Sequence, residues 1–258
     1  MPYELDLSGR RALVTGAGQG VGRGIALGLA AAGAEVIVND LVSERATDVV
    51  DEIVASGGSA DAAAFDVTDY AAVAGAVDRL GRIDVLVNNA GNAGVEGWGS
   101  RGPFAESEPA TWEPFLRMNL YGVMHCSRAV LPGMIDAGWG RIITIVSDAG
   151  RTGDPDMAAY SAAKAGAAGL TRALAIETGR HGVTVNNIAL GTMRTPATEA
   201  LWADPDDPRA KAILQRYVVR RPGAPDDAAA LAIFLASANA EWITGQTYPV
   251  NGGYSFAL

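Results

Sequence analysis

The feature that most limits the fold of this chain is an alternation of short β-branched apolar runs with longer stretches rich in alanine and leucine. The apolar runs predict strands at 11–14, 35–38, 61–65, 83–87, 141–146, 184–188 and 246–250. The longer stretches predict helices at 21–32, 43–56, 71–80, 111–136, 158–180 and 226–237. Repeated strand–helix–strand units form right-handed crossovers between parallel strands, and near-continuous apolar strands are typical of a sheet covered on both faces. We therefore expect an α/β, Rossmann-like fold: a doubly wound, mostly parallel seven-stranded sheet with helices on both faces.

The sequence contains no repeat and no interdomain linker. We expect residues 1–258 to form a single catalytic domain that binds a dinucleotide. Two segments, 92–108 and 192–222, do not fit the alternation, and both follow strand ends on the side where ligands bind in open α/β sheets. Long irregular connections there are often lids, so we interpret 192–222 as a substrate lid, with a plain surface loop as the alternative.

Composition excludes several classes of protein. Hydrophobic residues make up 49% of the chain, and 20 basic against 29 acidic residues give a net charge of −9. The apolar content argues against disorder, and the acidic balance argues against a nucleic acid partner. Cys126 is the only cysteine, the N-terminus lacks a signal-peptide pattern and no apolar run is long enough to cross a bilayer, so we expect a cytoplasmic protein with no membrane partner. No Cys/His or carboxylate spacing indicates a metal site.

A glycine-rich turn, Thr15-Gly16-Ala17-Gly18-Gln19-Gly20-Val21-Gly22, lies between the first predicted strand and the first predicted helix. Glycines there permit a tight turn and let a pyrophosphate approach the amides at a helix N-terminus. The second strand is followed by Asp40, which can accept hydrogen bonds from ribose hydroxyls and repels a 2′-phosphate. Since the turn contains no Lys or Arg, we predict NAD rather than NADP; an ordinary turn or N-cap aspartate is the alternative for Asp40.

Tyr160, Lys164 and Ser147 together could interconvert an alcohol and a ketone. The reaction needs a group that takes or gives the hydroxyl proton, and an ordinary tyrosine pKa of about 10 suits this poorly at neutral pH. Lys164 lies one helical turn after Tyr160, so we expect its charge to lower the pKa of the phenol. Ser147, at a strand end, can donate a hydrogen bond to the substrate oxygen as it gains charge. Each residue alone is common; the joint arrangement favours catalysis.

These motifs, taken in order, resemble those of the short-chain dehydrogenase/reductase family over nearly the whole chain. They are Thr15-Gly16-x-x-x-Gly20-x-Gly22, Asp66, Asn88-Asn89-Ala90-Gly91, Asn119, Ser147, Tyr160-x-x-x-Lys164, Gly191-x-x-x-Thr195, Ile243-Thr244-Gly245-Gln246 and Gly252-Gly253. The resemblance implies an oxidoreductase that transfers a hydride between NAD(H) and a secondary alcohol or ketone. It implies that Asn119, Ser147, Tyr160 and Lys164 are catalytic, with Lys164 also holding the nicotinamide ribose and Asn119 supporting a water path from Lys164 to solvent.

The resemblance also implies a set of cofactor contacts. They are Gly16, Gln19, Gly20, Val21, Gly22, Asp40, Asp66 (on the adenine), Val67, Asn89, Ala90, Gly91, Tyr160, Lys164, and Gly191, Thr192 and Thr195 (on the nicotinamide amide). Leu190 stands where the family usually has a proline, which would stiffen the turn before Gly191. Asn88 and Asn89 could clamp adjacent strands or simply form a strand-end turn.

The substrate and the assembly are less constrained. Secondary alcohols, sugars, steroids and acyl thioesters all fit, and Trp98, Met157 and Trp202 could line the pocket or pack in the core. Arg151 could pair with an acid or phosphate or lie in solvent, and Asp154 could contact a polar substrate or belong to a turn. The family implies a homotetramer (or a homodimer) through the helix at 158–180. Two alternatives are a 3-oxoacyl thioester reductase acting on ACP or CoA substrates, and an NAD-binding regulator without turnover.

Overall fold

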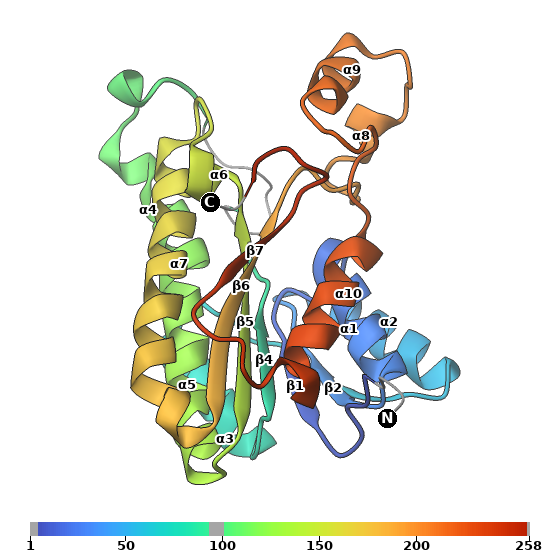
Figure 1. The fold of residues 1–258 in the computed structure, drawn as a ribbon, viewed down its shortest axis with the longest axis vertical. Helices are drawn as coiled ribbons and strands as arrows, with labels where there is room; N and C mark the ends of the chain where they lie inside the picture. The colour runs from blue at the N-terminus through green and yellow to red at the C-terminus, as the bar shows by residue number, and fades with distance from the viewer. Residues whose placement is uncertain (1–4, 93–100, 257–258) are drawn as a thin grey trace.

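The computed structural model describes residues 5–92 and 101–256, and in them seven strands form one sheet (Figure 1). The strands are β1 Arg11–Val14, β2 Glu35–Val38, β3 Ser59–Ala62, β4 Val85–Asn88, β5 Gly140–Ser147, β6 Val183–Leu190 and β7 Thr247–Val250. Their order is β3-β2-β1-β4-β5-β6-β7, and every neighbouring pair is parallel. The predicted doubly wound α/β fold is confirmed.

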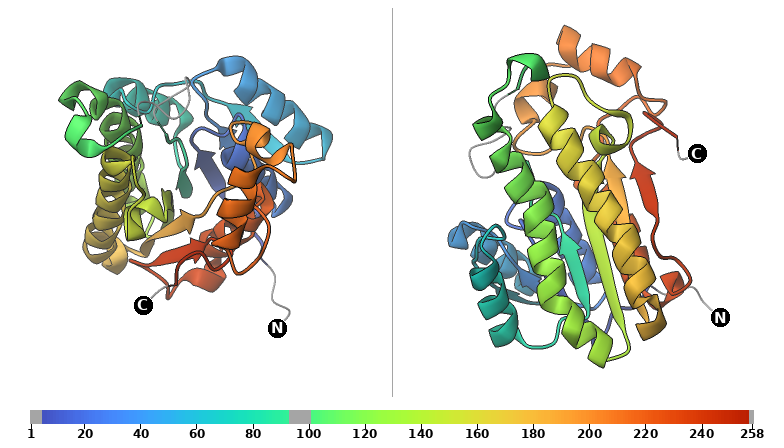
Figure 2. Two further views of the ribbon diagram at one scale, coloured as in Figure 1. Left: turned by 90° about the horizontal axis from the view of Figure 1, so that it is seen from above. Right: turned by 90° about the vertical axis from the view of Figure 1, so that its left-hand side faces the viewer.

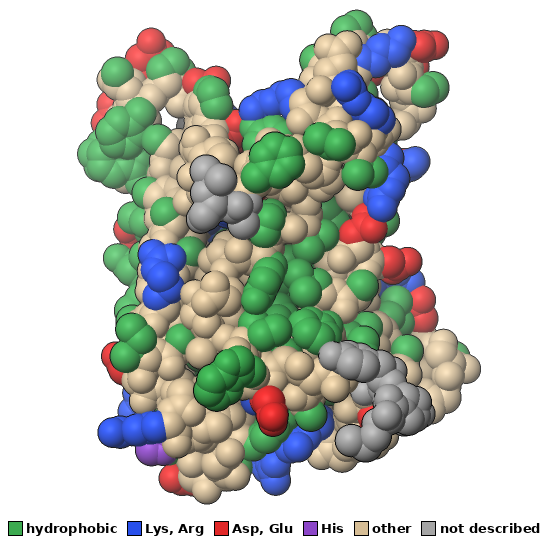
Figure 3. Space-filling view, viewed as in Figure 1, with side chains coloured by type: hydrophobic (Ala, Val, Ile, Leu, Met, Phe, Trp, Pro, Cys, Tyr) green, Lys and Arg blue, Asp and Glu red, His purple; other side chains and the backbone are tan. Residues whose placement is uncertain are grey.

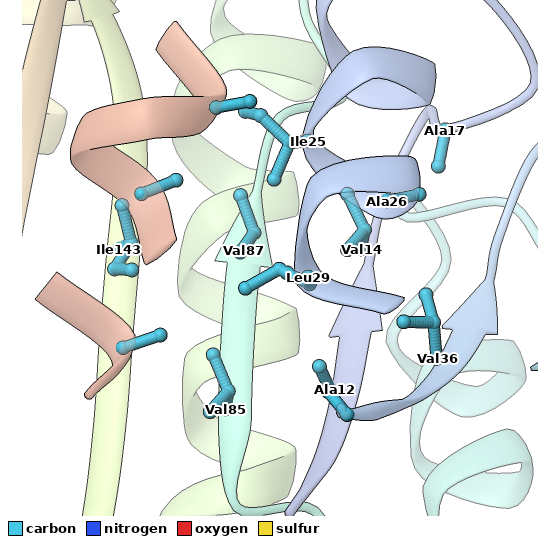
Figure 4. Packing of buried hydrophobic residues seen from close by; sticks show 14 of the residues in the cluster. Ala12, Val14, Ala17, Ile25, Ala26, Leu29, Val36, Val85, Val87 and Ile143 are labelled. Carbon is cyan, nitrogen blue, oxygen red and sulfur yellow. The ribbon is translucent and has the colours of Figure 1, made fainter. Parts of the chain in front are cut away.

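Helices cover both faces of the sheet, as Figures 1 and 2 show. One face carries α1 Gly20–Ala31, α2 Ser43–Ala55 and α10 Pro225–Ala236; the other carries α3 Tyr70–Leu80, α5 Gly122–Asp136 and α7 Ala158–Thr178. Successive strand residues point to opposite faces, so Val85 and Val87 pack with the α1 cluster and Leu86 with the α3–α5 cluster. Figure 4 shows Ile25 and Leu29 of α1 lying against Val87. This double burial explains why the strands are apolar at consecutive positions.

The third strand lies earlier than the predicted 61–65. Its ladder with β2 ends where Val38 is paired with Ala62. Beyond that point the side-chain amide of Asn39 donates to the carbonyls of Ala63 and Phe65, at 2.9 and 3.1 Å. Because a side chain takes over these carbonyls, the strand ends at Ala62, and Phe65 and Val67 are buried without being part of it.

The helix predicted at 111–136 is interrupted in its first third. The turns η1 Phe104–Glu106 and η2 Pro109–Thr111 lead into α4 Glu113–Leu116, then a π-helical turn, η3 Arg117–Tyr121, and then α5. Turns of this kind are rare and are often found at functional sites. Here the π-helical turn contains Asn119, which is fully buried and donates to the carbonyl of Phe115 at 2.9 Å.

The segment 192–222, which does not fit the predicted alternation, contains two helices. These are α8 Glu199–Trp202 and α9 Pro208–Gln215, which lie beyond the carboxyl ends of the strands (Figure 1). α9 begins at Pro208, and the side chain of Asp207 caps it by accepting from the amide of Arg209 at 2.7 Å. A short helix, α6 Ala149–Thr152, follows β5 directly. Figure 3 shows a notch between two projections at the top of the view. One is formed by α8 and α9, and the other lies on the opposite side, above α4.

The remaining short turns, η4 Gly179–His181 and η5 Ala238–Ala240, end α7 and follow α10. None of the helices within residues 5–92 and 101–256 has both the length and the apolar character that a membrane span requires.

Candidate active site

A cleft of about 800 Å³ opens at the carboxyl ends of the strands. The strand order reverses between β1 and β4, so the connections after these strands diverge and leave a crevice between them. Most of the predicted site residues line this cleft: Gly16, Gln19, Gly20, Val21, Asp40, Asp66, Val67, Asn89, Ala90, Gly91, Ser147, Tyr160, Lys164, Gly191, Thr192 and Thr195. Gly22 and Asn119 are buried directly behind its wall.

The glycine turn can be formed only by residues without a side chain at particular positions. Gly16 and Gly20 have left-handed backbone angles, with φ of +60° and +57°. A Cβ on Gly22 would lie 2.4 Å from both Asn89 Nδ2 and the Gly16 carbonyl oxygen, so the first turn of α1 packs directly on the glycine turn. Gln19 precedes α1 without a side-chain capping bond, which leaves the first amides of the helix available to an anion.

Buried polar side chains hold the turn in place. Asn89 donates from Nδ2 to the carbonyls of Thr15 and Gly16, at 3.0 and 2.9 Å, while Thr15 Oγ1 accepts from the amides of Asn89 and Ala90. Asn39 Oδ1 accepts from the Gly16 amide at 3.4 Å. These bonds join the ends of β1, β2 and β4. Sequence reasoning missed Asn39 and Thr15; the signal that could identify them is a polar residue directly after a buried strand.

Asp40 lies at the far end of the glycine turn, and a basic residue lies beside it. Its carboxylate is buried and accepts from the amides of Gly18 and Val42, at 3.1 and 3.0 Å. Arg45, in α2, lines the same end of the cleft. A Cβ on Gly18 would lie 2.6 Å from the Cβ of Arg45 and 2.7 Å from Asp40 Oδ2, so both residues pack on the turn. Sequence reasoning missed Arg45 because it considered basic residues only within the turn.

Tyr160 and Ser147 are joined by a hydrogen bond in the middle of the cleft. Tyr160 is on α7 and Ser147 ends β5. Burial raises the pKa of Tyr160 to about 12; the hydrogen bond with Ser147 opposes this shift and the negative charge of Asp154 adds to it. At neutral pH the phenol is therefore a proton donor.

The expectation that the pKa of this phenol lies below its ordinary value is wrong for the structure, because burial decides the direction of the shift. Lys164 Nζ donates to the carbonyl of Ile145 at 2.8 Å and lies 5.8 Å from the centre of the Tyr160 ring. Burial lowers the pKa of Lys164 itself to about 8. Desolvation is thus the largest cause of both shifts. The two side chains nevertheless occupy adjacent turns on the same face of α7, as the spacing predicts.

Asn119 and Lys164 both lie against the backbone at Gly91. A Cβ on Gly91 would lie 3.2 Å from Asn119 Oδ1 and 3.3 Å from Lys164 Nζ, so both groups converge closely on this glycine. Asn119 Oδ1 also accepts from the amide of Asn92 at 3.0 Å. The π-helical turn thus fixes the segment after β4 against α7.

Tyr217, which lies shortly after α9, fixes the segment that follows β6. Its hydroxyl accepts from the Thr192 amide at 2.7 Å and donates to Thr192 Oγ1 at 3.0 Å. The side chain is buried, and sequence reasoning missed it because Tyr217 is distant in sequence from its partner. Leu190, at the family's usual proline position, is the buried last residue of β6, and the Thr195 amide donates to Thr198 Oγ1 at 3.0 Å.

The three side chains named as candidates for the pocket wall have different positions. Met157 is buried and lines the cleft. Trp202 is buried in α8, is not part of the cleft lining, and donates from its indole to Thr198 Oγ1 at 3.3 Å. Trp98 lies outside the described residues.

A buried polar cluster connects the residue after Ser147 to the C-terminal segment. Asp148 accepts from Arg151 at 2.8 Å, from Ser255 at 2.8 Å and from Asn251 Nδ2 at 2.7 Å. Arg151 also donates to Ser255 Oγ at 2.6 Å. Arg151, for which we considered a substrate acid or phosphate, or solvent, instead forms an ion pair within the protein. Sequence reasoning missed this cluster because its members lie about a hundred positions apart.

The chain belongs to the short-chain dehydrogenase/reductase family. Residues 16–255 match the family model described as enoyl-(acyl carrier protein) reductase. A 3-oxoacyl-[acyl-carrier-protein] reductase of Synechocystis sp. is 42% identical over 253 residues, which cover 96% of this chain and 97% of the relative. The chain is accordingly an NAD(P)-dependent oxidoreductase that interconverts alcohols and ketones.

Solved structures of this family superpose on nearly the whole chain. A gluconate 5-dehydrogenase from Burkholderia cenocepacia, in complex with NADP and tartrate, has 37% identity and a TM-score of 0.90, covering 99% of this chain and 98% of its own. A 7α-hydroxysteroid dehydrogenase, in complex with NADH and 7-oxo glycochenodeoxycholic acid, has 36% identity and a TM-score of 0.87, covering 97% and 96%. The two relatives bind different dinucleotides. In the described part of this chain, no group of three or more His, Cys, Asp or Glu could hold a metal ion.

Proposed function

We propose that this enzyme oxidises secondary alcohols with NAD and reduces the corresponding ketones with NADH, using Tyr160 as its acid/base. The observation that carries the proposal is the hydrogen bond between Tyr160 and Ser147 in a cleft that Lys164 also lines. Both hydroxyls can reach one substrate oxygen, and the glycine turn lines the same cleft.

The residues at the other end of the cleft fit a dinucleotide. The left-handed glycines and the absence of space for a Cβ at Gly22 form a cradle of main-chain amides that suits a pyrophosphate. In this proposal Gly16, Gln19, Gly20, Val21 and Gly22 hold the pyrophosphate, Asp40 the adenosine ribose, Asp66 and Val67 the adenine, Asn89, Ala90, Gly91, Tyr160 and Lys164 the nicotinamide riboside, and Gly191, Thr192 and Thr195 the nicotinamide amide. When bound, the nicotinamide supplies or accepts the hydride.

In the direction of ketone reduction, Tyr160 and Ser147 both donate hydrogen bonds to the carbonyl oxygen. As that oxygen gains negative charge, the Ser147 hydroxyl stabilises it and the phenol of Tyr160 transfers its proton to it, which gives the alcohol. The ammonium of Lys164, 5.8 Å from the ring centre, stabilises the phenolate that forms, and Asn119 supports the return of a proton from solvent by way of Lys164. Alcohol oxidation is the reverse sequence.

The preference for NAD rests on Asp40. Two main-chain amides hold its carboxylate against the glycine turn, where its charge repels a 2′-phosphate. Arg45 beside it has the opposite effect and provides some tolerance for NADP. We expect kcat/KM to be at least about tenfold higher with NAD than with NADP, and Asp40→Ala to narrow that ratio, since about 1.4 kcal/mol corresponds to tenfold. Better turnover with NADP in the unchanged enzyme would contradict this preference.

Tyr160→Phe tests the acid/base assignment. The variant keeps the ring and loses only the hydroxyl, so it should fold, bind NADH with unchanged affinity and lose about a hundredfold or more in kcat on any ketone that the enzyme reduces. Ketone reduction is followed by NADH absorbance and binding by NADH fluorescence. A variant that keeps most of its kcat would overturn the mechanism. Preferential activity on 3-oxoacyl thioesters with NADPH would favour the biosynthetic alternative.

We also propose that residues 1–258 form one catalytic domain in which 192–222 is the substrate lid. The support is that Thr192, Thr195 and Ile213 of this segment line the cleft while α8 and α9 lie beyond the strand ends. Cleavage near the exposed Asp204 and Asp206 by a protease should slow when NAD and substrate are both present. Equal cleavage rates in all conditions would contradict a lid.

A homotetramer is the proposed assembly. Exposed apolar side chains on the outer helices support it: Met124 on α5 is 44% exposed and Ile176 on α7 is 85% exposed. The small residues of 158–169 would let helices from two subunits approach closely. A molar mass of one subunit by light scattering would contradict this assembly.

A further inference from the structure

Three arginines line the cleft, although the chain has a net charge of −9, and we call the end of the cleft beside α9 and the C-terminal segment the substrate end. Arg101, Arg209 and Arg216 all line the cleft, and the last two lie on and directly after α9. Arg209 pairs with Asp207 at 2.7 Å, whereas neither Arg101 nor Arg216 forms an ion pair with any residue in the described ranges. Figure 3 shows Lys and Arg side chains over the projection formed by α8 and α9. Within residues 5–92 and 101–256, these two guanidinium groups beside the cleft are therefore not neutralised by a carboxylate.

Arg216 is held in position by aromatic residues. It follows α9 directly, its guanidinium carbon lies 4.4 Å from the centre of the Tyr254 ring, and it donates to the Tyr254 hydroxyl. The Tyr254 ring lies 5.4 Å from the ring of Tyr217, which is buried and bonded to Thr192. Stacking on a ring orients a guanidinium and leaves the N–H groups that do not bond to Tyr254 free for a ligand. This arrangement differs from a surface arginine that rotates freely in water.

We propose that Arg216, assisted by Arg101, binds a carboxylate on the substrate, so that the alcohol or ketone on which the enzyme acts is part of a carboxylic acid. The inference rests on the proposed function, because it assigns a second group on the substrate whose carbonyl or hydroxyl meets Tyr160 and Ser147. A guanidinium matches a carboxylate with two parallel hydrogen bonds. The substrate thus lies with its reacting carbon toward β5 and α7 and its acid group toward α9 and the C-terminal segment.

Asp154 favours a carboxylate over a phosphate. It lines the same end of the cleft, and its charge acts on both Tyr160 and Tyr254. Repulsion grows with the charge of the ligand, so a dianionic phosphate meets about twice the repulsion of a singly charged carboxylate. Two arginines and one aspartate leave one positive charge in excess, which a singly charged carboxylate neutralises and a dianionic phosphate exceeds.

The test compares hydroxy acids with their methyl esters, which share the reacting carbon and differ in charge. Oxidation of 2- to 5-hydroxy acids, their esters and a hydroxyalkyl phosphate is measured with NAD for the unchanged enzyme and for Arg216→Ala. The control is Arg220→Ala, because Arg220 is exposed on the same segment and does not line the cleft. NADH affinity is measured for each variant.

The unchanged enzyme should favour at least one acid over its ester by about tenfold or more in kcat/KM. Arg216→Ala should remove that preference by raising KM for the acid, while turnover of the ester and NADH affinity stay unchanged. The control Arg220→Ala should keep the preference of the unchanged enzyme. Equal kcat/KM for acid and ester, an equal loss on both in Arg216→Ala, or a preference for the phosphate would each overturn the inference. Oxidation of the esters by the unchanged enzyme distinguishes these outcomes from a failure of the proposed function. If the proposed function were wrong, neither the acids nor the esters would be oxidised.

Discussion

Where we propose that the cofactor binds (the cofactor end), the cleft wall is main chain, held by short buried amide and hydroxyl side chains. At the proposed substrate end, the wall consists of long side chains from segments far apart in sequence. Asn39, Thr15 and Asn89 join three strand ends to the glycine turn through bonds of 2.7–3.4 Å involving main-chain atoms or strand-adjacent side chains. At the substrate end, Arg216 donates a hydrogen bond to the Tyr254 hydroxyl, and the Tyr217 hydroxyl accepts one from the Thr192 amide. We therefore expect the first end to tolerate few substitutions and the second to change by exchange of single side chains.

This difference indicates how one fold can serve one cofactor class and many substrates. A cradle of main-chain amides recognises a pyrophosphate whatever side chains surround it. The sequence requirement of the cradle is therefore the position of its glycines. A pocket wall of Arg, Tyr and Met is set by side-chain chemistry and is free to vary while the sheet stays constant. Lys164 lies between the two ends, and substitution there should have the largest effect on activity and on stability.

Lys164→Met should abolish turnover and raise stability at neutral pH. Burial lowers the pKa of Lys164 to about 8 from an ordinary value of 10.5, so the folded protein disfavours the charged form. Between pH 8 and 10.5 the unfolded chain holds a proton that the folded chain has released, so the stability of the unchanged enzyme rises with pH in that window. The shift corresponds to about 3 kcal/mol, which is the penalty at pH 7 that methionine removes.

Urea unfolding of both proteins at pH 7 and pH 10 checks this prediction. The stability difference in favour of Lys164→Met should be largest at pH 7 and shrink by pH 10. Parallel pH dependence in the two proteins would mean that the ammonium of Lys164 is not desolvated in the folded enzyme.

Gly22→Ala should weaken the cofactor end next most strongly. The new Cβ would lie 2.4 Å from Asn89 Nδ2 and from the Gly16 carbonyl, so α1 or the clamp must shift. We expect a loss of about 1–3 kcal/mol in stability, as for other overpacked sites, and a loss of about tenfold or more in NADH affinity measured by fluorescence titration. Gly133→Ala is the matched control, because a Cβ on Gly133 of α5 meets nothing within 4 Å and alanine favours the helix. Equal effects of the two substitutions would show that packing at Gly22 has no special role.

The same contrast explains which parts of the molecule could be predicted from the sequence. Parallel strands, the glycine turn and the Tyr160–Lys164 spacing are local patterns, so the fold and the cofactor end follow from consecutive residues. The cluster of Asp148 and Asn251 joins positions 103 apart, and no local pattern marks it. The end of β3 was misplaced because a side chain, Asn39, replaces the strand ladder there.

The electrostatics of the site were the least predictable part. Helical spacing correctly brings Tyr160 and Lys164 to one face, but it carries no information on how deeply they are buried. Burial changes both pKa values, raising that of Tyr160 to about 12 and lowering that of Lys164 to about 8. A prediction that considered only the charge of Lys164 gave the wrong direction for the phenol, because desolvation depends on the packing of distant segments.

Tyr217→Phe should have the smallest effect and one confined to the substrate end. It removes the hydroxyl that bonds to Thr192 and keeps the ring that packs on Tyr254 at 5.4 Å. Loss of a partner for the Thr192 amide should cost about 1–2 kcal/mol in stability and raise KM for the substrate a few-fold. Tyr248→Phe in β7 is the control, since no hydrogen bond of the Tyr248 hydroxyl is found among the described residues. An equal fall in NADH affinity in Tyr217→Phe and Gly22→Ala would contradict the comparison. It would mean that a contact beside α9 affects cofactor binding at the glycine turn, so the two ends of the cleft do not act independently.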